Sequence, residues 1–486
     1  MNVVEPILFQ TRLNPLALAI CVPGSKIEAV TYGLLGNFID NAARSAIKAG
    51  ISPGNLVATY IDDAILHIVV TLGLLRLGAV TLSLRSPKGV AGIKPDIILT
   101  DRIGQVSQEG TVLGVDLSWL EGSASPPGPS AHQVKPEDTC RIVLTSGSTG
   151  SAKGIAFSHE MLTGRISHYT YSKGPRYAHC PRFFCDLSFS TSPGFRYTMS
   201  LLSRGGTIYL LGPEPADILQ TIDLHHITGM ATSPYGLGEF LKFFEADPAF
   251  DVTFDHIICQ GAMLSRELSQ RARARMCQNL YSSYGSTETT TVAFGPASVT
   301  ERVPGAVGYV QPGVVVEIVD SAGKLLPPLS DGALRIRSDH MASEYVGDPE
   351  ATKMFFRDGC FYSGDIGHVT PDGLLVITGR EKTAINLGGD TVSPEVIESV
   401  IVAFPNIAEA GVFASNNDLG IAELFALIVP TGPFDEGALR RHCAERLPPY
   451  SVPLRFIVTD ALPRGGQGKL ERHRLSEFAR AVAKSN

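Results

Sequence analysis

Residues 144–154 read LTSGSTGSAKG, a composition that suggests phosphate binding. Backbone N–H groups and hydroxyls in a Gly/Ser/Thr turn can donate to an anion, and Lys153 adds positive charge. The segment is not an ordinary P-loop (G-x-x-x-x-G-K-[ST]), because Ala152 and Gly154 stand where that pattern requires Gly and Ser or Thr. A flexible linker is the alternative interpretation, but a compact apolar run, 141–144, precedes the segment directly. The stretch alone leaves both interpretations open, and the rest of the chain has to decide between them.

Four further stretches carry polar residues suited to the same chemistry. They are SSYGSTET (282–289), FYSGDIG (361–367), GREKTAINLGGDTVSPEVIE (379–398) and LPRGGQGKLER (462–472). In this order, the five stretches resemble those of the adenylate-forming superfamily, which includes acyl-CoA synthetases, peptide-synthetase adenylation domains and firefly luciferase. The resemblance covers nearly the whole chain.

The resemblance implies a reaction in two steps. A carboxylate attacks the α-phosphate of ATP, pyrophosphate leaves, and the acyl-adenylate then reacts with a thiol. Because both reactants are anions, positioning and charge neutralisation dominate such a transfer. The cofactors implied are ATP, Mg²⁺ and CoA, or the phosphopantetheine of a carrier protein in place of CoA.

The resemblance assigns the glycine-rich loop to the β- and γ-phosphates. The assigned residues are Thr145, Ser146, Gly147, Ser148, Thr149, Gly150 and Lys153. The family usually has Pro at the position of Ala152, a difference that alters loop stiffness more than charge.

The stretch 282–289 resembles the family's adenine and metal site. Tyr284 would stack on adenine, Thr287 would contact the α-phosphate, and Glu288 would hold Mg²⁺, which prefers hard oxygen ligands. A polar turn with a solvated glutamate is the alternative for this stretch alone. Gly261, Ala262 and Gly285 are assigned to the same nucleotide site.

Two further motifs complete the nucleotide site. Asp365 resembles the aspartate that accepts hydrogen bonds from both ribose hydroxyls, with Arg380 reinforcing it. The family often has Trp and Thr where this chain has Phe361 and Ser363. Neither difference removes the carboxylate.

The C-terminal motifs resemble the mobile parts of the family. Lys382 stands at the hinge position, and Gly388 and Gly389 match the loop that faces the thiol after domain rotation. Lys469 matches the catalytic lysine that bridges the carboxylate and the phosphate, a role suited to a mobile ammonium. Gly465 and Gln467 replace the hydroxyl residues usual before that lysine.

The acid pocket is expected to be lined by 182–195, 232–240, 260–264 and the residues before Tyr284. The apolar character of these segments favours an aryl or short-to-medium aliphatic acid, and it comes from Phe184, Phe189, Phe195, Tyr235 and Met263. Asp186 leaves a second possibility open, because it resembles the aspartate that pairs with a substrate ammonium in amino-acid-activating domains.

A stand-alone acid–CoA ligase is the function we expect. The alternative is a stand-alone adenylation protein that loads an acid or amino acid onto a separate carrier protein. A nucleotide-binding module without catalysis and a luciferase-type oxidation are less favoured. The motifs name neither the acid nor the thiol acceptor, and they say nothing of oligomeric state.

Alternating helical and strand-like runs over about 30–240 predict helix-covered, mostly parallel sheets that position these motifs. Short strands with glycine turns over about 303–380 predict a small β-barrel-like part. We expect an α/β N-terminal domain, 1–380, that binds ATP and the acid, and a small mobile α+β domain, 381–486.

The bulk composition fits a soluble globular enzyme. The 486 residues are 44% hydrophobic and 18% charged, and the net charge of −7 gives no electrostatic case for nucleic acid or a membrane surface. The eight cysteines show no zinc-type spacing, and the N-terminus lacks the features of a signal peptide. A cytoplasmic location is expected.

Overall fold

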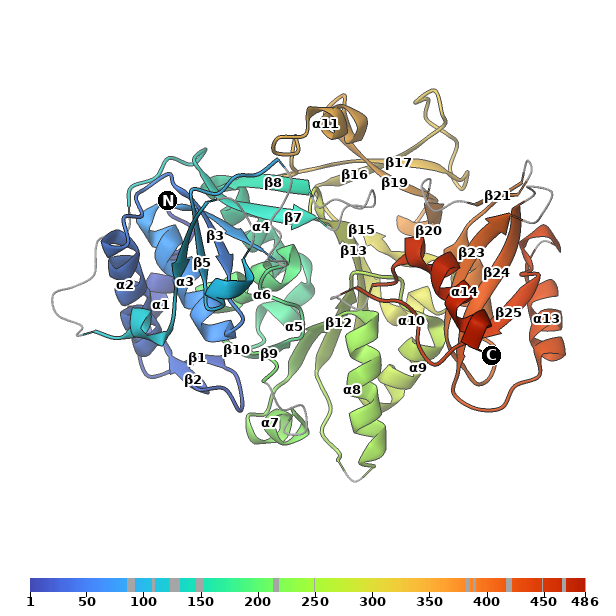
Figure 1. The fold of residues 1–486 in the computed structure, drawn as a ribbon, viewed down its shortest axis with the longest axis horizontal. Helices are drawn as coiled ribbons and strands as arrows, with labels where there is room; N and C mark the ends of the chain where they lie inside the picture. The colour runs from blue at the N-terminus through green and yellow to red at the C-terminus, as the bar shows by residue number, and fades with distance from the viewer. Residues whose placement is uncertain are drawn as a thin grey trace.

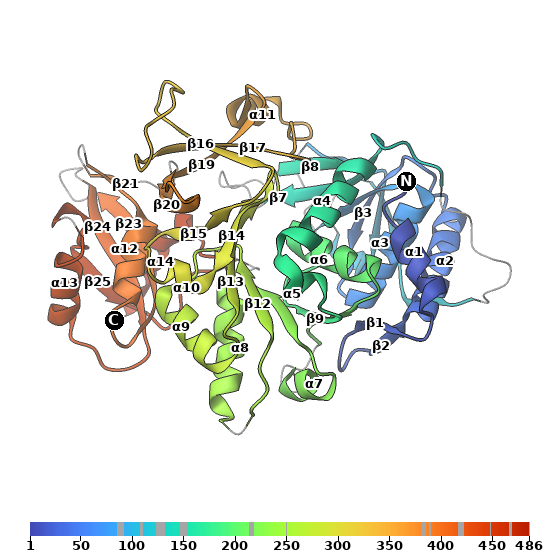
Figure 2. The ribbon, with the colours of Figure 1, turned by 180° about the vertical axis from the view of Figure 1, so that it is seen from behind.

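The computed structural model describes residues 1–486 except 85–91, 107–109, 123–131, 146–152, 213–217, 249, 381–384, 388–389, 417–421, 448, 466–468 and 486. Figure 1 shows the N-terminal elements at one end of the molecule and the C-terminal elements at the other. Figure 2 shows the same arrangement from behind.

The first large sheet has six strands among the described residues, in the order β6-β5-β3-β4-β7-β8. The strands are β3 (Leu56–Tyr60), β4 (Val80–Ser83), β5 (Ile97–Thr100), β6 (Thr111–Gly114), β7 (Thr139–Thr145) and β8 (Lys153–Ser158). All neighbours are parallel except β7 and β8, which pair antiparallel. This mostly parallel sheet confirms the expectation from the alternating sequence pattern.

Helices α1 (Glu5–Leu13), α2 (Tyr32–Lys48) and α3 (Ala64–Leu77) lie beside the first sheet (Figure 1). Helix α3 is apolar on nearly every side and almost wholly buried, which its sequence explains. Asp63 caps its first turn, and Gly78 ends it in the left-handed conformation, with φ at 82°. Helix α3 therefore begins and ends at defined residues between strands β3 and β4.

The second sheet is continuous over fourteen strands of the described chain. Its main path runs β16-β17-β19-β20-β15-β14-β13-β12-β11-β9-β10-β1-β2, and β18 (Phe356–Arg357) pairs with β19. The parallel part comprises β1 (Leu18–Cys21), β9 (Arg182–Cys185), β10 (Thr207–Tyr209), β11 (Gly229–Thr232), β12 (His256–Gln260) and β13 (Leu280–Ser286), and β2 (Ala29–Thr31) is antiparallel at the edge. Parallel strands bring their carboxyl ends to one edge, where sites are commonly built.

The antiparallel part of this sheet holds the β-rich region expected from about residue 303. Its strands are β14 (Thr290–Pro296), β15 (Ala306–Val310), β16 (Val314–Val319), β17 (Gly332–Ser338), β19 (Cys360–Val369) and β20 (Leu374–Arg380). They enclose a separate apolar cluster that includes Val292, Leu334, Ile336 and Leu375. These strands carry Asp365 and Arg380 toward the carboxyl end of β13.

The helices of the N-terminal part pack along the sheets. They are α4 (His159–Ser172), α5 (Gly174–Ala178), α6 (Ser192–Ser203), α7 (Ile218–Leu224), α8 (Pro234–Ala246), α9 (Arg266–Arg275), α10 (Ala297–Thr300) and α11 (Pro349–Phe355). Single 3-10 turns occupy Ile103–Gln105 and Leu117–Leu120. No helix in the described part of the chain is long and apolar enough to cross a membrane.

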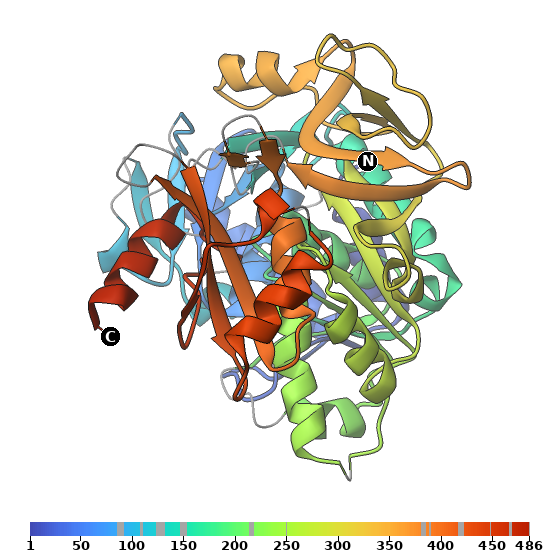
Figure 3. The ribbon, with the colours of Figure 1, turned by 90° about the vertical axis from the view of Figure 1, so that its right-hand side faces the viewer.

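The smaller C-terminal unit has its own sheet and core. Strands β23 (Ile407–Asn416), β24 (Ala422–Pro430) and β25 (Arg455–Val458) form one sheet, and β21 (Ile385–Leu387) pairs with β22 (Asp390–Val392). Helices α12 (Pro394–Val402), α13 (Glu436–Ala444) and α14 (Leu475–Ser485) accompany them, with 3-10 turns at Pro449–Ser451 and Arg472–Arg474. In the end-on view of Figure 3 this unit lies in front of the large sheets.

Candidate active site

The glycine-rich loop joins two antiparallel strands. Thr145, the last residue of β7, is the register partner of Lys153, the first residue of β8. A P-loop would lead from its strand into a helix, so this hairpin explains why the P-loop pattern fails here. Of the residues assigned to the phosphates, Ser146, Gly147, Ser148, Thr149 and Gly150 lie outside the described residues.

Strand β8 brings Lys153 to the residues around position 345. The N–H of Val346 donates to the Gly154 carbonyl at 2.8 Å. The ammonium of Lys153 lies 5.9 Å from the centre of the Tyr345 ring. Lys153 is thereby placed near the carboxylate that Tyr345 contacts.

That carboxylate belongs to Glu288, which is only 7% exposed. The Tyr345 hydroxyl donates to Glu288 Oε1 at 2.7 Å. The N–H of Ala342 donates to the Glu288 carbonyl at 2.8 Å, which fixes the backbone beneath the side chain. Burial and the nearby Glu288 carboxylate raise the pKa of Tyr345, so its hydroxyl stays a donor.

Arg165 on α4 also contacts the backbone of the segment that carries Glu288. Its guanidinium donates to the carbonyls of Thr287, Glu288 and His340 at 2.7, 2.8 and 2.8 Å. The carbonyl of Thr287 is therefore fixed, whereas no hydrogen bond engages its hydroxyl within the described part. The sequence motifs pointed to neither Arg165 nor Tyr345, because no recognised pattern surrounds either residue.

Tyr284, Asp365 and Arg380 form a second group. Asp365 on β19 and Arg380 on β20 are register partners, and Arg380 Nε donates to Asp365 Oδ1 at 2.6 Å. The Tyr284 hydroxyl donates to Oδ2 of the same carboxylate. Burial and Asp365 raise the pKa of Tyr284, and Asp365 raises that of Arg380. The sequence paired Asp365 with Arg380 correctly and did not foresee the third partner.

Ser363 compensates for one departure from the family pattern. Its hydroxyl accepts a hydrogen bond from the Asp365 N–H at 3.1 Å, so the turn before the aspartate keeps a hydroxyl acceptor. Phe361, the other departure, is buried and packs against Phe356 with ring centres 5.1 Å apart.

The remaining nucleotide residues follow β12 and β13. Gln260 and Ser283 are register partners, so Gly261 and Ala262 emerge beside Tyr284. A β-carbon on Gly285 would lie 1.9 Å from the Thr290 carbonyl oxygen, so the β13–β14 hairpin closes only with glycine there. The structure thus brings Gly261, Ala262, Tyr284 and Gly285 to one edge of the sheet.

Lys469 is an exposed residue of the C-terminal unit. The Gly465 N–H donates to the Lys469 carbonyl at 2.9 Å. Arg464 pairs with Glu409 at 2.6 Å and lies 5.6 Å from the centre of the Tyr235 ring on α8. Arg464 therefore links the C-terminal unit to a segment expected to line the acid pocket. Lys382, Gly388 and Gly389 lie outside the described residues.

Of the apolar residues expected to line the acid pocket, Tyr235 and Met263 are exposed, and the three phenylalanines belong to two separate clusters. Phe184 packs against Phe240, whereas Phe189 and Phe195 lie over the buried guanidinium of Arg141. These contacts place the three phenylalanines in the protein core rather than around one common pocket.

Asp186 is partly buried and directly follows β9. Thr232 donates its hydroxyl to Asp186 Oδ2 at 2.6 Å, and burial raises the pKa of Asp186 to about 6. A β-carbon on Gly236 would lie 1.9 Å from the same oxygen. The carboxylate is therefore packed closely against the first turn of α8.

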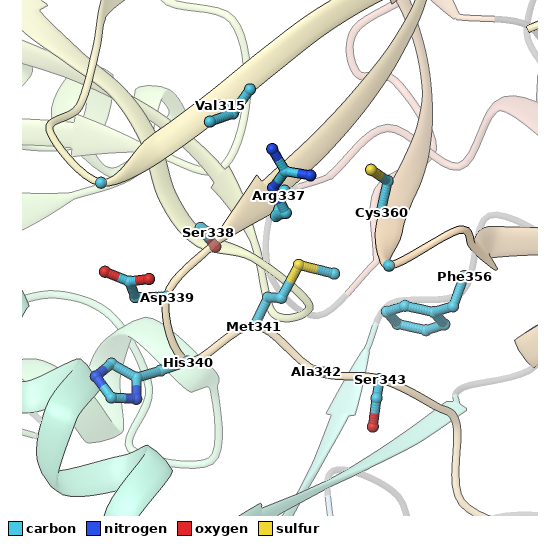
Figure 4. Close-up of a pocket in the computed structure, with 12 residues that line it drawn as sticks. Val315, Arg337, Ser338, Asp339, His340, Met341, Ala342, Ser343, Phe356 and Cys360 are labelled. Atoms are coloured by element: carbon cyan, nitrogen blue, oxygen red, sulfur yellow. The ribbon is translucent and has the colours of Figure 1, made fainter.

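A pocket of about 720 Å³ opens beside the backbone that supports Glu288 (Figure 4). Arg337, Ser338, Asp339, His340 and Met341 contribute to its wall. The Ser338 hydroxyl donates to the Thr289 carbonyl at 3.0 Å, which joins this wall to the 282–289 motif. Its lining includes none of the described residues that the sequence motifs assigned to the nucleotide site.

Comparison with known proteins agrees with this arrangement. A family model described as AMP-binding enzyme matches residues 10–346, and one for the AMP-binding enzyme C-terminal domain matches residues 396–469. A 4-chlorobenzoate–CoA ligase of Arthrobacter is 26% identical over 99% of this chain and 95% of its own length. The fatty acid–acyl-carrier-protein ligase ScoC of Streptomyces coeruleorubidus is 26% identical over 98% of this chain and 96% of its own.

Solved structures share the fold. The o-succinylbenzoate CoA synthetase MenE from Bacillus subtilis, in complex with its acyl-adenylate intermediate, superposes with a TM-score of 0.83 at 21% identity, covering 97% of each chain. The amide bond synthetase McbA from Marinactinospora thermotolerans gives 0.83 at 23% identity, covering 98% of this chain and 99% of its own. With the two family models and the paired motifs, these findings show that the chain belongs to the AMP-binding enzymes, the adenylate-forming superfamily.

Proposed function

We propose that this protein activates a small carboxylic acid with ATP, releases pyrophosphate and transfers the acyl group from the acyl-adenylate to the thiol of CoA. The observation that carries the proposal is that two groups of contacting side chains lie at the two ends of the short segment 284–288. Tyr284, at its start, contacts Asp365 and Arg380, and Glu288, at its end, contacts Tyr345 near Lys153. The carboxylate of Asp365 would suit the ribose of a nucleotide. Glu288 and Lys153 would suit the Mg²⁺ ion and the phosphates of the same nucleotide.

In this proposal Asp365 accepts hydrogen bonds from the ribose hydroxyls. Arg380 holds one carboxylate oxygen in place, and the Tyr284 hydroxyl orients the other. The ring of Tyr284 would then stack on adenine, with Gly261, Ala262 and Gly285 leaving room for the base. The ionised carboxylate offers lone pairs beyond those its protein partners use.

Lys153 and the loop 145–150 would bind the β- and γ-phosphates, with Thr287 at the α-phosphate. Glu288 fits the magnesium ion that such a triphosphate requires. Tyr345 occupies one of its oxygens, and no hydrogen bond engages Oε2 within the described part of the chain. A single carboxylate, completed by phosphates and water, is a usual Mg²⁺ site, and the bound ion would neutralise charge on the phosphates.

The C-terminal unit would supply Lys469 in the first step and move before the second. We propose a boundary near residue 380, with Lys382 as the hinge and Gly388 and Gly389 facing the thiol afterward. The contact of Arg464 with Tyr235 supports an arrangement in which Lys469 lies over the acid site.

The thiol acceptor has one specific alternative, because relatives of both kinds match at the same identity. The Arthrobacter relative is a CoA ligase, and ScoC is an acyl-carrier-protein ligase. Loading of a carrier protein is therefore the second candidate. Comparing thioester formation with CoA and with a phosphopantetheinylated carrier protein distinguishes the two.

The adenylation step is tested by incubating the protein with ATP, Mg²⁺ and a panel of carboxylic acids. We expect AMP and pyrophosphate with at least one acid, and loss of that activity in Lys153→Ala. The exposed Lys324 provides a matched control, since Lys324→Ala removes the same charge from a distant turn. Formation of ADP and orthophosphate, or no turnover with any acid, would overturn the proposal.

A further inference from the structure

Two cations are buried side by side next to the segments assigned to the acid. Lys173, directly after α4, is 3% exposed, and Arg196 on α6 is 6% exposed. The Lys173 ammonium and the Arg196 guanidinium lie 4.8 and 4.6 Å from the centre of one aromatic ring, that of Tyr169. Neither cation belongs to one of the five sequence motifs.

The partners of these cations are all neutral. Lys173 donates to the Ser283 hydroxyl at 2.6 Å and lies 4.4 Å from the centre of the Phe294 ring. Arg196 donates to the Thr290 hydroxyl at 2.6 Å. Among the described residues, neither cation has a carboxylate within ion-pairing distance. Burying a charge without an opposite charge is costly, so an anion is the missing component.

Other buried nitrogen atoms lie close to Lys173 and Arg196. Among the described residues, Arg196 Nε and Gln260 Nε2 are buried donors without a hydrogen-bond partner, and His168 Nε2, which donates in one of its two tautomers, is buried without a partner as well. The Tyr169 hydroxyl donates to Gln260 Oε1 at 3.1 Å, which leaves the amide nitrogen of Gln260 free to donate. Buried polar groups are nearly always paired, so this set of donors indicates an acceptor that the protein itself does not supply.

Arg165 provides a contrast within the same helix region. It is as deeply buried, but each of its three nitrogens donates to a backbone carbonyl. Arg165 is thus a structural cation. Arg141 is also buried among hydroxyls and aromatic rings, with its Nε unpartnered among the described residues. The site of Lys173 and Arg196 therefore differs from both in holding two cations on one ring beside the unused amide nitrogen of Gln260.

The position of the cluster relates it to the acid. Ser283 directly precedes Tyr284, and Gln260 directly precedes Gly261, so both partners come from segments expected to line the acid pocket. Arg196 directly follows the third such segment, 182–195. The cluster around the two cations therefore touches three of the segments expected to line the acid pocket.

We propose that Lys173 and Arg196 bind a second carboxylate at the far end of the substrate, so that this enzyme activates dicarboxylic acids. The inference rests on the proposed function, because it concerns the acid of that same reaction. One carboxylate would react with ATP, and the other would pair with the two cations and accept from Gln260 Nε2. Burial and Arg196 lower the pKa of Lys173, and a bound carboxylate would favour its charged form.

The first test compares matched acids on the parent protein. Aliphatic diacids from malonate to sebacate and the three phthalate isomers are paired with monocarboxylic acids of equal length or ring. We expect kcat/KM for pyrophosphate release at least about 100-fold higher for the best diacid than for its monoacid partner. Equal or higher values for the monoacids across the panel would overturn the inference while leaving the proposed function intact.

The second test uses variants of the cluster. Lys173→Met and Arg196→Gln should each abolish the diacid preference while leaving KM for ATP within about twofold, and Arg196→Lys should restore part of the preference. Lys353→Met, at a side chain 78% exposed, is the matched control and should behave as the parent does. A diacid preference that survives both cluster variants would overturn the inference.

A binding readout separates failure of the inference from failure of the proposed function. Without ATP, the best diacid should raise the melting temperature of the parent protein, and its monoacid partner should not. If no acid releases pyrophosphate but a diacid still stabilises the parent and not Lys173→Met, the adenylation proposal fails and the carboxylate site stands. If a monoacid is turned over and no diacid stabilises the protein, the carboxylate site fails.

Discussion

Tyr345 donates its hydroxyl hydrogen to Oε1 of Glu288 across 2.7 Å, and the two residues come from segments 57 positions apart in the chain. The hydrogen bond leaves the second oxygen of a buried carboxylate available, and it fixes the direction in which that oxygen points. Groups that orient a metal ligand typically affect affinity or activity by about 10–100-fold. Tyr345 is therefore a positioning residue in the proposed reaction.

Tyr345→Phe removes this hydroxyl and keeps the ring beside Lys153. We expect kcat/KM for pyrophosphate release to fall about 10-fold and the Mg²⁺ concentration for half-maximal rate to rise, because Glu288 loses its orienting donor. The measurement is a magnesium titration of initial rates at saturating ATP. Tyr171→Phe, at a side chain 78% exposed, is the control. An unchanged magnesium dependence in Tyr345→Phe would show that Glu288 does not need the hydroxyl.

Asp365→Asn tests the proposed ribose contact. The change leaves Arg380 without its charged partner and weakens acceptance from the ribose hydroxyls, so KM for ATP should rise about 10–100-fold. The parent should discriminate against 2′-deoxy-ATP, and the variant should discriminate much less. Comparing kcat/KM for ATP and 2′-deoxy-ATP in both proteins isolates the contact. Equal discrimination in parent and variant would place the ribose elsewhere.

The mutual placement of Asp365 and Arg380 could be predicted from sequence because both belong to recognised motifs on adjacent strands. The strands and helices around β3, α3 and β4 were equally predictable, since each has a clear apolar pattern and a glycine or capping residue at its end. The β7–β8 hairpin could not be predicted, because the sequence of Ile155 and its neighbours fits either a helix or a strand.

The contacts that the sequence did not reveal all involve polar residues inside the core. Arg165, Lys173 and Arg196 lie in or beside helices, where a cation ordinarily faces solvent. Only the packing of α4 and α6 against β13 and β14 shows that they are buried. Phe184, Phe189 and Phe195 suggested one apolar pocket, but the strand and the helix that carry them direct these rings into separate clusters.

Asp186→Asn should alter how stability depends on pH. The folded-state pKa of Asp186, about 6, lies above the unfolded value near 3.8, so the folded state binds the proton more tightly. Its contribution to the free energy of unfolding is fully present below about pH 4 and is lost as pH rises through about 6. A shift of this size corresponds to about 3 kcal/mol, so the variant should gain up to that amount over the parent above pH 6 and little below pH 4.

Urea denaturation followed by circular dichroism at several pH values measures this difference. Asp251→Asn, at an exposed aspartate, should give a curve parallel to that of the parent. Parallel curves for Asp186→Asn as well would show that the carboxylate is no harder to ionise in the folded protein than in the unfolded chain.

Lys469 offers the sharpest test of a two-state mechanism. Arg464 pairs with Glu409 within the C-terminal unit and lies over Tyr235 of the N-terminal part. Such a contact across the two units must break if the C-terminal unit rotates between the two steps. A lysine that moves with this unit would act in one step only.

Lys469→Ala should therefore reduce acyl-adenylate formation by about 10²–10³, the usual cost of losing a charge-stabilising contact at the reacting group. The same variant, given pre-made acyl-adenylate and CoA, should form thioester at nearly the parent rate, because the lysine has by then left the site. Lys382→Pro, which fixes one backbone torsion at the proposed hinge, should spare adenylation and slow thioester formation. Rapid-quench measurement of each half-reaction checks both variants, with Lys324→Ala as the control. If Lys469→Ala slows the two half-reactions equally, the lysine is structural or both steps share one arrangement of the two units, and the proposed rotation loses its support.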